Sequence, residues 1–85
     1  MDNSGIYFFI ASDASFLLGV TPKTIRNWIK LNQIEYKLST LNHSTRYLFS
    51  LDEINRKRIE KNKPVLSIEQ VLKLKQQIRV VHSNY

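Results

Sequence analysis

The segment 20–30, which reads Val-Thr-Pro-Lys-Thr-Ile-Arg-Asn-Trp-Ile-Lys, constrains the fold of this chain more than any other stretch. Thr21 is a good N-cap, because its hydroxyl can accept a hydrogen bond from an N–H of the first helical turn. Pro22 follows at the first helical position, where a helix tolerates proline best. The apolar residues recur at i, i+3 and i+4 and therefore share one face of the predicted helix: Ile25, Trp28 and Ile29.

The other long side chains of this helix are cationic or carry an amide: Lys23, Arg26, Asn27 and Lys30. A short helix with such a front has the size and the hydrogen-bonding groups to lie in the major groove of DNA. The spacing of Trp28 with Ile25 puts the indole in the core, where its N–H needs a partner. Stacking of the indole on a base is the alternative.

A second short helix precedes this one. Ser12 can cap a helix over 13–18, whose inner face is formed by Ala14, Leu17 and Leu18. Gly19 follows at the position where a left-handed residue ends a helix. Two short helices joined by about three residues, with glycine at the bend, form a helix-turn-helix.

Strand signals lie on both sides of this unit. The β-branched and aromatic run 6–10 predicts a short buried strand, and the polar residues 1–5 predict a disordered tail. The segments 35–38 and 46–49 suit two further strands, with 42–44 between them as a turn. These segments predict a β-hairpin with a polar, partly basic tip, which would form a wing.

Capping boxes predict two helices in the second half. Ser50 at the N-cap and Glu53 at N3 start a helix that reaches about Asn62. The sequence therefore predicts a mainly α fold with a small β-hairpin wing, a winged helix-turn-helix of about four helices. The predicted division is a tail over 1–5, a DNA-binding domain over 6–66 and a C-terminal helix over 67–85.

That last helix would start at a second capping box, Ser67 to Gln70, and run to about Val81. Its apolar residues follow 3-4-3 spacing, an a/d seam about two heptads long. The seam consists of Val71, Leu74, Ile78 and Val81. It either packs within the chain or pairs two copies of it as a homodimer, and the pattern leaves both readings open.

Charge is concentrated in the middle of the chain. The net charge is +6, and residues 21–63 hold ten of the 13 basic residues against four of the seven acids. A basic surface concentrated in this way indicates a polyanionic partner, with plain solvation of a basic protein as the alternative.

Composition excludes several classes. The 85 residues suit one small domain, and the absence of cysteine excludes disulfides and thiolate metal sites. His43 and His82 are isolated, so neither a metal nor another cofactor is expected. No paired carboxylates, nucleophile–base set or glycine-rich phosphate loop is visible, so an enzyme is not expected. No apolar run approaches the ~20 residues that span a bilayer, so no membrane partner is expected. A cytoplasmic location is the default expectation, and binding to DNA would make it nucleoid-associated.

The order of these motifs resembles the DNA-binding domain of the MerR superfamily, including its small excisionase-like members. The matching elements are Leu18-Gly19-Val20, Thr21-Pro22-Lys23-Thr24-Ile25-Arg26, Asn27-Trp28, Arg46-Tyr47, Asp52-Glu53-Ile54 and the run 64–71. The resemblance covers roughly residues 7–75 and implies a winged helix-turn-helix that binds double-stranded DNA. Asn27 replaces a frequent tyrosine, and Ser44-Thr45 stand where family wings usually place glycine. The chain ends before the family's coiled coil and effector domain, so no small-molecule effector is expected.

The predicted DNA-binding residues are Thr21, Lys23, Thr24, Arg26, Asn27, Lys30, Lys37, His43, Ser44, Thr45, Arg46 and Tyr47. One of Lys23 and Arg26 should touch base edges and the other phosphate, unless both merely solubilise the helix. Thr24 either donates to phosphate or caps the helix. Arg46 suits a narrow minor groove or its flanking phosphates, with a cross-strand pair to Glu35 as the alternative.

Tyr47 is expected in the core or beside a phosphate, and His43 in the wing turn. The run Arg56-Lys57-Arg58, with Lys61 and Lys63, is densely cationic. Arg56 and Lys57 are candidate phosphate contacts, although solvation or a localisation signal would also account for the run.

The function predicted from these observations is sequence-preferring binding of double-stranded DNA by a small transcriptional regulator or architectural factor. Several copies could line up cooperatively on DNA. An excisionase, a segregation adaptor or a phage-packaging adaptor would use the same scaffold. A winged-helix module that binds proteins is the alternative of another class.

Overall fold

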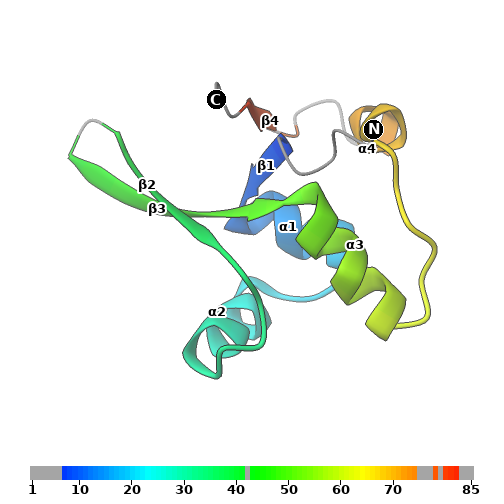
Figure 1. The fold of residues 1–85 in the computed structure, drawn as a ribbon, viewed down its shortest axis with the longest axis horizontal. Helices are drawn as coiled ribbons and strands as arrows, with labels where there is room; N and C mark the ends of the chain where they lie inside the picture. The colour runs from blue at the N-terminus through cyan, green and yellow to red at the C-terminus, as the bar shows by residue number, and fades with distance from the viewer. Residues whose placement is uncertain (1–6, 42, 75–77, 79, 83–85) are drawn as a thin grey trace.

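The computed structural model describes residues 7–41, 43–74, 78 and 80–82. Strand β1 (Tyr7–Ile10) leads into helices α1 (Ala11–Leu18) and α2 (Pro22–Lys30). Strands β2 (Lys37–Leu41) and β3 (Ser44–Ser50), helices α3 (Leu51–Glu60) and α4 (Ile68–Leu74), and strand β4 (Val80–His82) follow. The described part of the chain thus has four helices and a small antiparallel sheet, so the predicted number of helices is confirmed (Figure 1).

The sheet has the strand order β2-β3-β1-β4, and all its neighbours are antiparallel. The hairpin β2–β3 is confirmed, but its strands lie closer to the turn than predicted. Pairing continues to Leu41 opposite Ser44, which leaves two residues between the strands. One of these is His43, with a left-handed φ of 64°. The hairpin projects from the helices, with its tip far from α4 (Figure 1).

The core lies between the inner part of the sheet and the helices. Its largest fully buried side chains include Phe9 of β1, Phe49 of β3, Ile25 of α2 and Ile54 of α3. Burying an aliphatic or aromatic side chain stabilises the fold by about 1.5–3 kcal/mol. Each of these elements therefore contributes at least one buried side chain to a common core.

The first three helices end in the same way. Gly19, Asn32 and Asn62 each adopt a positive φ within two residues of a helix end. In each case the N–H of this residue and the N–H of the next residue close the 5→2 and 6→1 hydrogen bonds of a Schellman motif. After α2, for example, the Gln33 N–H donates to the Trp28 carbonyl at 2.8 Å.

The predicted start of the first helix is wrong by two residues. Helix α1 begins at Ala11, with Ile10 as its N-cap and no side-chain capping bond. Ile10 pairs with Leu48 in the sheet, so its extended backbone fixes the turn into the helix before Ser12 is reached. Ser12 lies in the first turn instead, where its carbonyl accepts a hydrogen bond from Ser15 Oγ at 2.7 Å.

The prediction of a C-terminal helix to Val81 is also wrong. Helix α4 ends at Leu74, and 80–82 form β4, which pairs with β1. The valines of this segment favour an extended backbone, and β1 offers an edge that must find a partner. The reciprocal box at the start of α4 is confirmed, since Ser67 N–H donates to Gln70 Oε1 and Gln70 N–H to Ser67 Oγ.

The predicted helical seam for dimerisation is also wrong, because it requires a helix that reaches Val81. Val71 is fully buried and Ile78 is 9% exposed in the core of the chain itself, whereas Leu74 is 53% exposed. Val81 belongs to a strand, so the four residues do not line one helical face. Val71 and Ile78, with the partly buried Ile68 and Val80, therefore pack in the core of the domain itself. The predicted tail over 1–5 lies outside the described residues. None of the described helices is long and apolar enough to cross a membrane.

Candidate nucleic-acid interface

Helix α2 begins as the sequence predicts. Thr21 is the N-cap, and its Oγ1 accepts a hydrogen bond from Thr24 N–H at 3.3 Å. The Thr24 hydroxyl lies 3.2 Å from the same oxygen, so Thr24 takes part in the cap. Pro22 occupies the first helical position. Thr21, Pro22 and Lys23 are all exposed at this start of the helix.

The apolar face of α2 anchors it from behind. Ile25 is fully buried, while Trp28 and Ile29 are partly buried against the core. Trp28 is covered by Lys57, whose Nζ lies 4.5 Å from the ring centroid. The predicted placement of Trp28 on the core side is confirmed.

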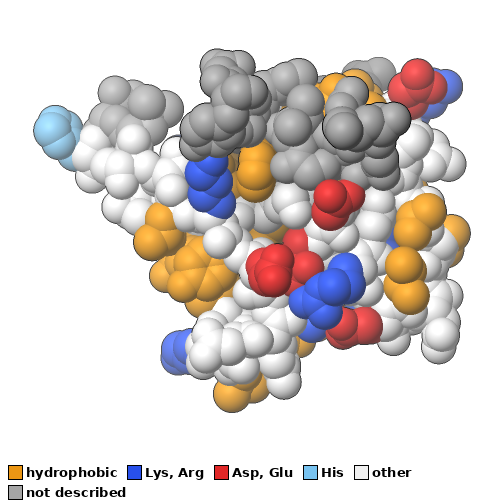
Figure 2. Space-filling model, viewed as in Figure 1, with side chains coloured by type: hydrophobic (Ala, Val, Ile, Leu, Met, Phe, Trp, Pro, Cys, Tyr) orange, Lys and Arg blue, Asp and Glu red, His pale blue; other side chains and the backbone are white. Residues whose placement is uncertain are grey.

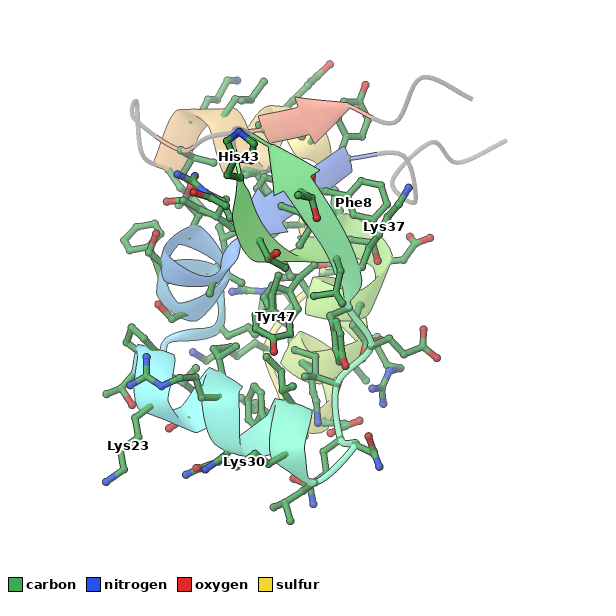
Figure 3. The ribbon with its side chains drawn as sticks, turned by 90° about the vertical axis from the view of Figure 1, so that its left-hand side faces the viewer. Phe8, Lys23, Lys30, Lys37, His43 and Tyr47 are labelled. Carbon is green, nitrogen blue, oxygen red and sulfur yellow. The ribbon has the colours of Figure 1, made fainter. Side chains whose placement is uncertain are left out.

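The opposite face of α2 is exposed to solvent. Its exposed polar side chains are Lys23, Arg26, Asn27 and Lys30. None of the three cations forms an ion pair with another described residue. They are therefore available to a ligand, and Lys23 and Lys30 extend outward from the helix in Figure 3.

The hairpin supplies a second exposed polar group. Residues 43–47 are all exposed, and His43 stands at the tip (Figures 2 and 3). The register places Arg46 opposite Ser39 rather than Glu35, so the predicted alternative of a pair with Glu35 is not formed. Tyr47 is 41% exposed, and its ring contacts that of Tyr36 edge-on, with centroids 5.0 Å apart.

The two groups share one side of the molecule. In Figure 3, α2 crosses below the hairpin, and Tyr47 points into the space between them. Lys37, which was predicted to bind DNA, is only partly exposed. Its Nζ lies 5.4 Å from the ring centroid of Phe8. Beside the hairpin, a shallow groove of ≈ 300 Å³ runs along the start of α1 and is lined by Ile10, Ala11, Ser12, Arg46 and Tyr47.

The prediction that Arg56 and Lys57 contact phosphate stays a prediction, but the structure gives both side chains partners within the fold. Arg56 is bound to Glu53, to Glu60 at 2.6 Å and to the Gln33 carbonyl at 3.3 Å. Lys57 is 6% exposed and also binds Glu60, at 3.2 Å. Acidic and basic side chains accordingly lie together over α3 in Figure 2. Their spacing of three and four residues on one helix creates these pairs and could have indicated them.

Two further basic side chains hold the end of α1. Arg58 donates to the Leu17 carbonyl and, at 2.7 Å, to the Pro64 carbonyl. Lys63 Nζ donates to the Leu18 carbonyl at 3.1 Å. Cations are favourable at the negative end of a helix, where the last carbonyls lack partners. Most of the basic run 56–63 thus acts within the fold, with Lys61 exposed.

Glu53 has a role that the capping box alone does not predict. The Ser50 hydroxyl accepts from Glu53 N–H at 3.0 Å, as expected. The carboxylate, however, accepts from Glu35 N–H at 2.8 Å and from Arg56. Burial tends to raise the pKa of Glu53, but these hydrogen bonds and the Arg56 and Lys57 charges hold the pKa below its ordinary value.

The exposed apolar residues of the hairpin region were also missed. Tyr36 is 43% and Leu38 54% exposed, and Leu38 lies opposite Tyr47 in the ladder. Apolar side chains gather beneath the hairpin in Figure 2. Strand alternation could have indicated this apolar cluster weakly, because Tyr36 and Leu38 are two residues apart and therefore share a face.

Within the described residues, no group of three or more His, Asp or Glu side chains could hold a metal ion. Comparison with protein families, curated proteins and solved structures found no match to this chain.

Proposed function

We propose that this chain is a sequence-preferring double-stranded DNA-binding protein built as a MerR-like winged helix-turn-helix. Helix α2 would enter the major groove, and the β2–β3 hairpin would reach the adjacent minor groove as a wing. The observation that carries the proposal is the division of the basic residues. Those of α2 and Arg46 are exposed and form no ion pair with another described residue, whereas Arg56, Lys57, Arg58 and Lys63 are bound within the fold.

The dimensions of α2 support the proposal. Nine residues make a helix about 14 Å long and about 10–12 Å across, and the major groove is about 12 Å wide. Arg26 and Asn27 are adjacent on the exposed face, and their side chains are suited to guanine and adenine respectively. Lys23 and Lys30 flank them and suit phosphates. Such a protein could serve as a small regulator, an architectural factor, an excisionase, or a segregation or packaging adaptor.

Selection of binding sites from a random duplex pool tests the proposal. Recovery of a defined site is expected, and complex size then gives the copy number. Arg46→Ala should weaken binding to all duplexes and lower the salt slope by about one. Arg26→Ala and Asn27→Ala should reduce discrimination by about 1–3 kcal/mol for each base that the shortened side chain no longer reaches. If all three variants bind like the parent, the proposal is wrong.

A protein-binding module is the second candidate, because Tyr36, Leu38 and Tyr47 expose apolar surface beside α2. Exposed apolar clusters mark docking sites for proteins more often than for duplex DNA. In that case Leu38→Ala would abolish capture of the partner, and the duplex pool would yield no site.

A further inference from the structure

The connection between α2 and β2, residues 31–36, is held by side chains of α3. The Gln33 carbonyl accepts a hydrogen bond from Arg56 Nη2 at 3.3 Å. Two residues later, Glu35 N–H donates to Glu53 Oε2 at 2.8 Å. Between them Ile34 is 4% exposed in the core. Three successive residues of a loop are thus fixed to the body of the domain.

Glu53 is the centre of this arrangement. Its side chain is 5% exposed, and Arg56 binds both its oxygens, with Nε at 2.7 Å from Oε1 and Nη2 on Oε2. Bidentate pairs of arginine and carboxylate restrict geometry as well as adding energy. One buried carboxylate therefore orients Arg56 and receives the backbone of the loop.

The same helix also holds α2 and, through the loop, the hairpin. Lys57, one residue after Arg56, covers the Trp28 ring of α2. Tyr36, one residue after Glu35, contacts Tyr47 of β3. Helix α3 is consequently a common support for the two elements that carry the exposed polar residues.

We propose that Glu53 is a positioning residue, which fixes the hairpin relative to α2 by binding Arg56 and the backbone of the connecting loop. This inference rests on the proposed function where it concerns DNA. A helix and a wing can read one site together only if their spacing is held, whereas attraction to phosphates in general does not need it. Glu53 thus contributes to selectivity without touching DNA.

Glu53→Ala and Glu53→Gln test the inference, with Glu60→Gln as the matched control. All three raise the net charge by one, so they change general attraction to DNA alike. Glu60 is also a partner of Arg56, but it is 49% exposed, and its polar contacts are with Arg56 and Lys57 of its own helix. Glu53→Gln keeps the side-chain volume and an oxygen that can accept from Glu35 N–H. It therefore tests the Glu53–Arg56 charge pair even if Glu53→Ala does not fold.

The first readout is the distance between α2 and the hairpin without DNA. The chain has no cysteine, so spin labels at Asn27→Cys and Thr45→Cys report one pair only. The parent and Glu60→Gln should give one narrow distance distribution, Glu53→Ala a broad one and Glu53→Gln an intermediate one. A narrow parental distribution in folded Glu53→Gln and Glu53→Ala overturns the inference.

The second readout is the affinity ratio between a selected duplex and a scrambled duplex, measured on unlabelled proteins. Folded Glu53→Ala should lose roughly tenfold in this ratio, the equivalent of one base contact, while Glu60→Gln keeps the parental ratio. An unchanged ratio despite a broad distance distribution overturns the link to selectivity. If the parent itself binds no duplex, the proposed function fails, and the distance measurement alone decides the role of Glu53.

Discussion

Replacement of Lys23 by alanine should weaken DNA binding while leaving the fold as stable or more stable. Lys23 lies directly after Pro22 in the first turn of α2, at the positive end of the helix dipole. A cation there is unfavourable by about 0.3–1 kcal/mol, so its removal should raise the free energy of unfolding by a similar amount. Weaker binding by this variant cannot then be ascribed to unfolding.

The magnitude of the effect on binding follows from counterion release. Three exposed cations of α2 and the hairpin are assigned to phosphates in the proposed complex: Lys23, Lys30 and Arg46. If all three neutralise phosphates, the slope of log K against log salt is about −2.7, at about −0.9 for each contact. Lys23→Ala should make the slope shallower by about 0.9 and lower the affinity about eightfold at 0.1 M salt.

Lys73→Ala is the matched control, because Lys73 is an exposed lysine on α4, away from α2 and the hairpin (Figure 1). Fluorescence anisotropy with a labelled duplex at several salt concentrations gives both slopes, and urea unfolding gives both stabilities. The control should keep the parental slope. Equal slopes for the two variants would refute the assignment of the exposed face of α2 to phosphate binding.

Three further predictions concern stability. Gly19→Ala should lower the free energy of unfolding by about 1–2 kcal/mol in urea titrations, because Gly19 has a φ of 68° and an added Cβ would meet Lys63 Nζ at 2.5 Å. Ser50→Ala should cost about 1 kcal/mol by removing the N-cap of α3, unlike Ser44→Ala in the hairpin. Because the folded-state pKa of Glu53 is lowered, its contribution is present above the unfolded pKa of about 4.3 and is lost as the pH falls through the folded value. Thermal unfolding of Glu53→Gln should therefore vary less with pH below that point than unfolding of the parent, and equal pH dependence would contradict the pairing.

The elements that local signals define were predictable. Thr21 and Pro22 set the start of α2, Gly19 its connection to α1, and Ser50 the start of α3, since each acts through hydrogen bonds or dihedral limits within a few residues. The exposed face of α2 followed from the same periodicity, because the burial of Ile25 determines which side chains point outward. The hairpin was found, but its register depends on pairing and not on composition.

What failed depended on long-range contacts. The segment after Leu74 has spacing that suits a helix, and only the open edge of β1 decides for a strand at Val80. For the basic run 56–63 the sequence left phosphate contact and solvation open, yet Arg58 and Lys63 bind carbonyls of α1 more than 40 residues earlier. A sequence shows that Glu53 and Arg56 can pair along a helix, but not that Glu35 N–H lies beside them.

Chemical-shift mapping with a selected or random duplex tests whether α2 and the hairpin form the DNA-binding surface. We expect the amide signals that move to lie in α2, from Lys23 to Lys30, and in the hairpin, from His43 to Tyr47, and the signals of α4 to stay in place. Signals that move only around other exposed apolar residues, Ile59, Val65 and Leu72, or no signals that move at all, would contradict this assignment.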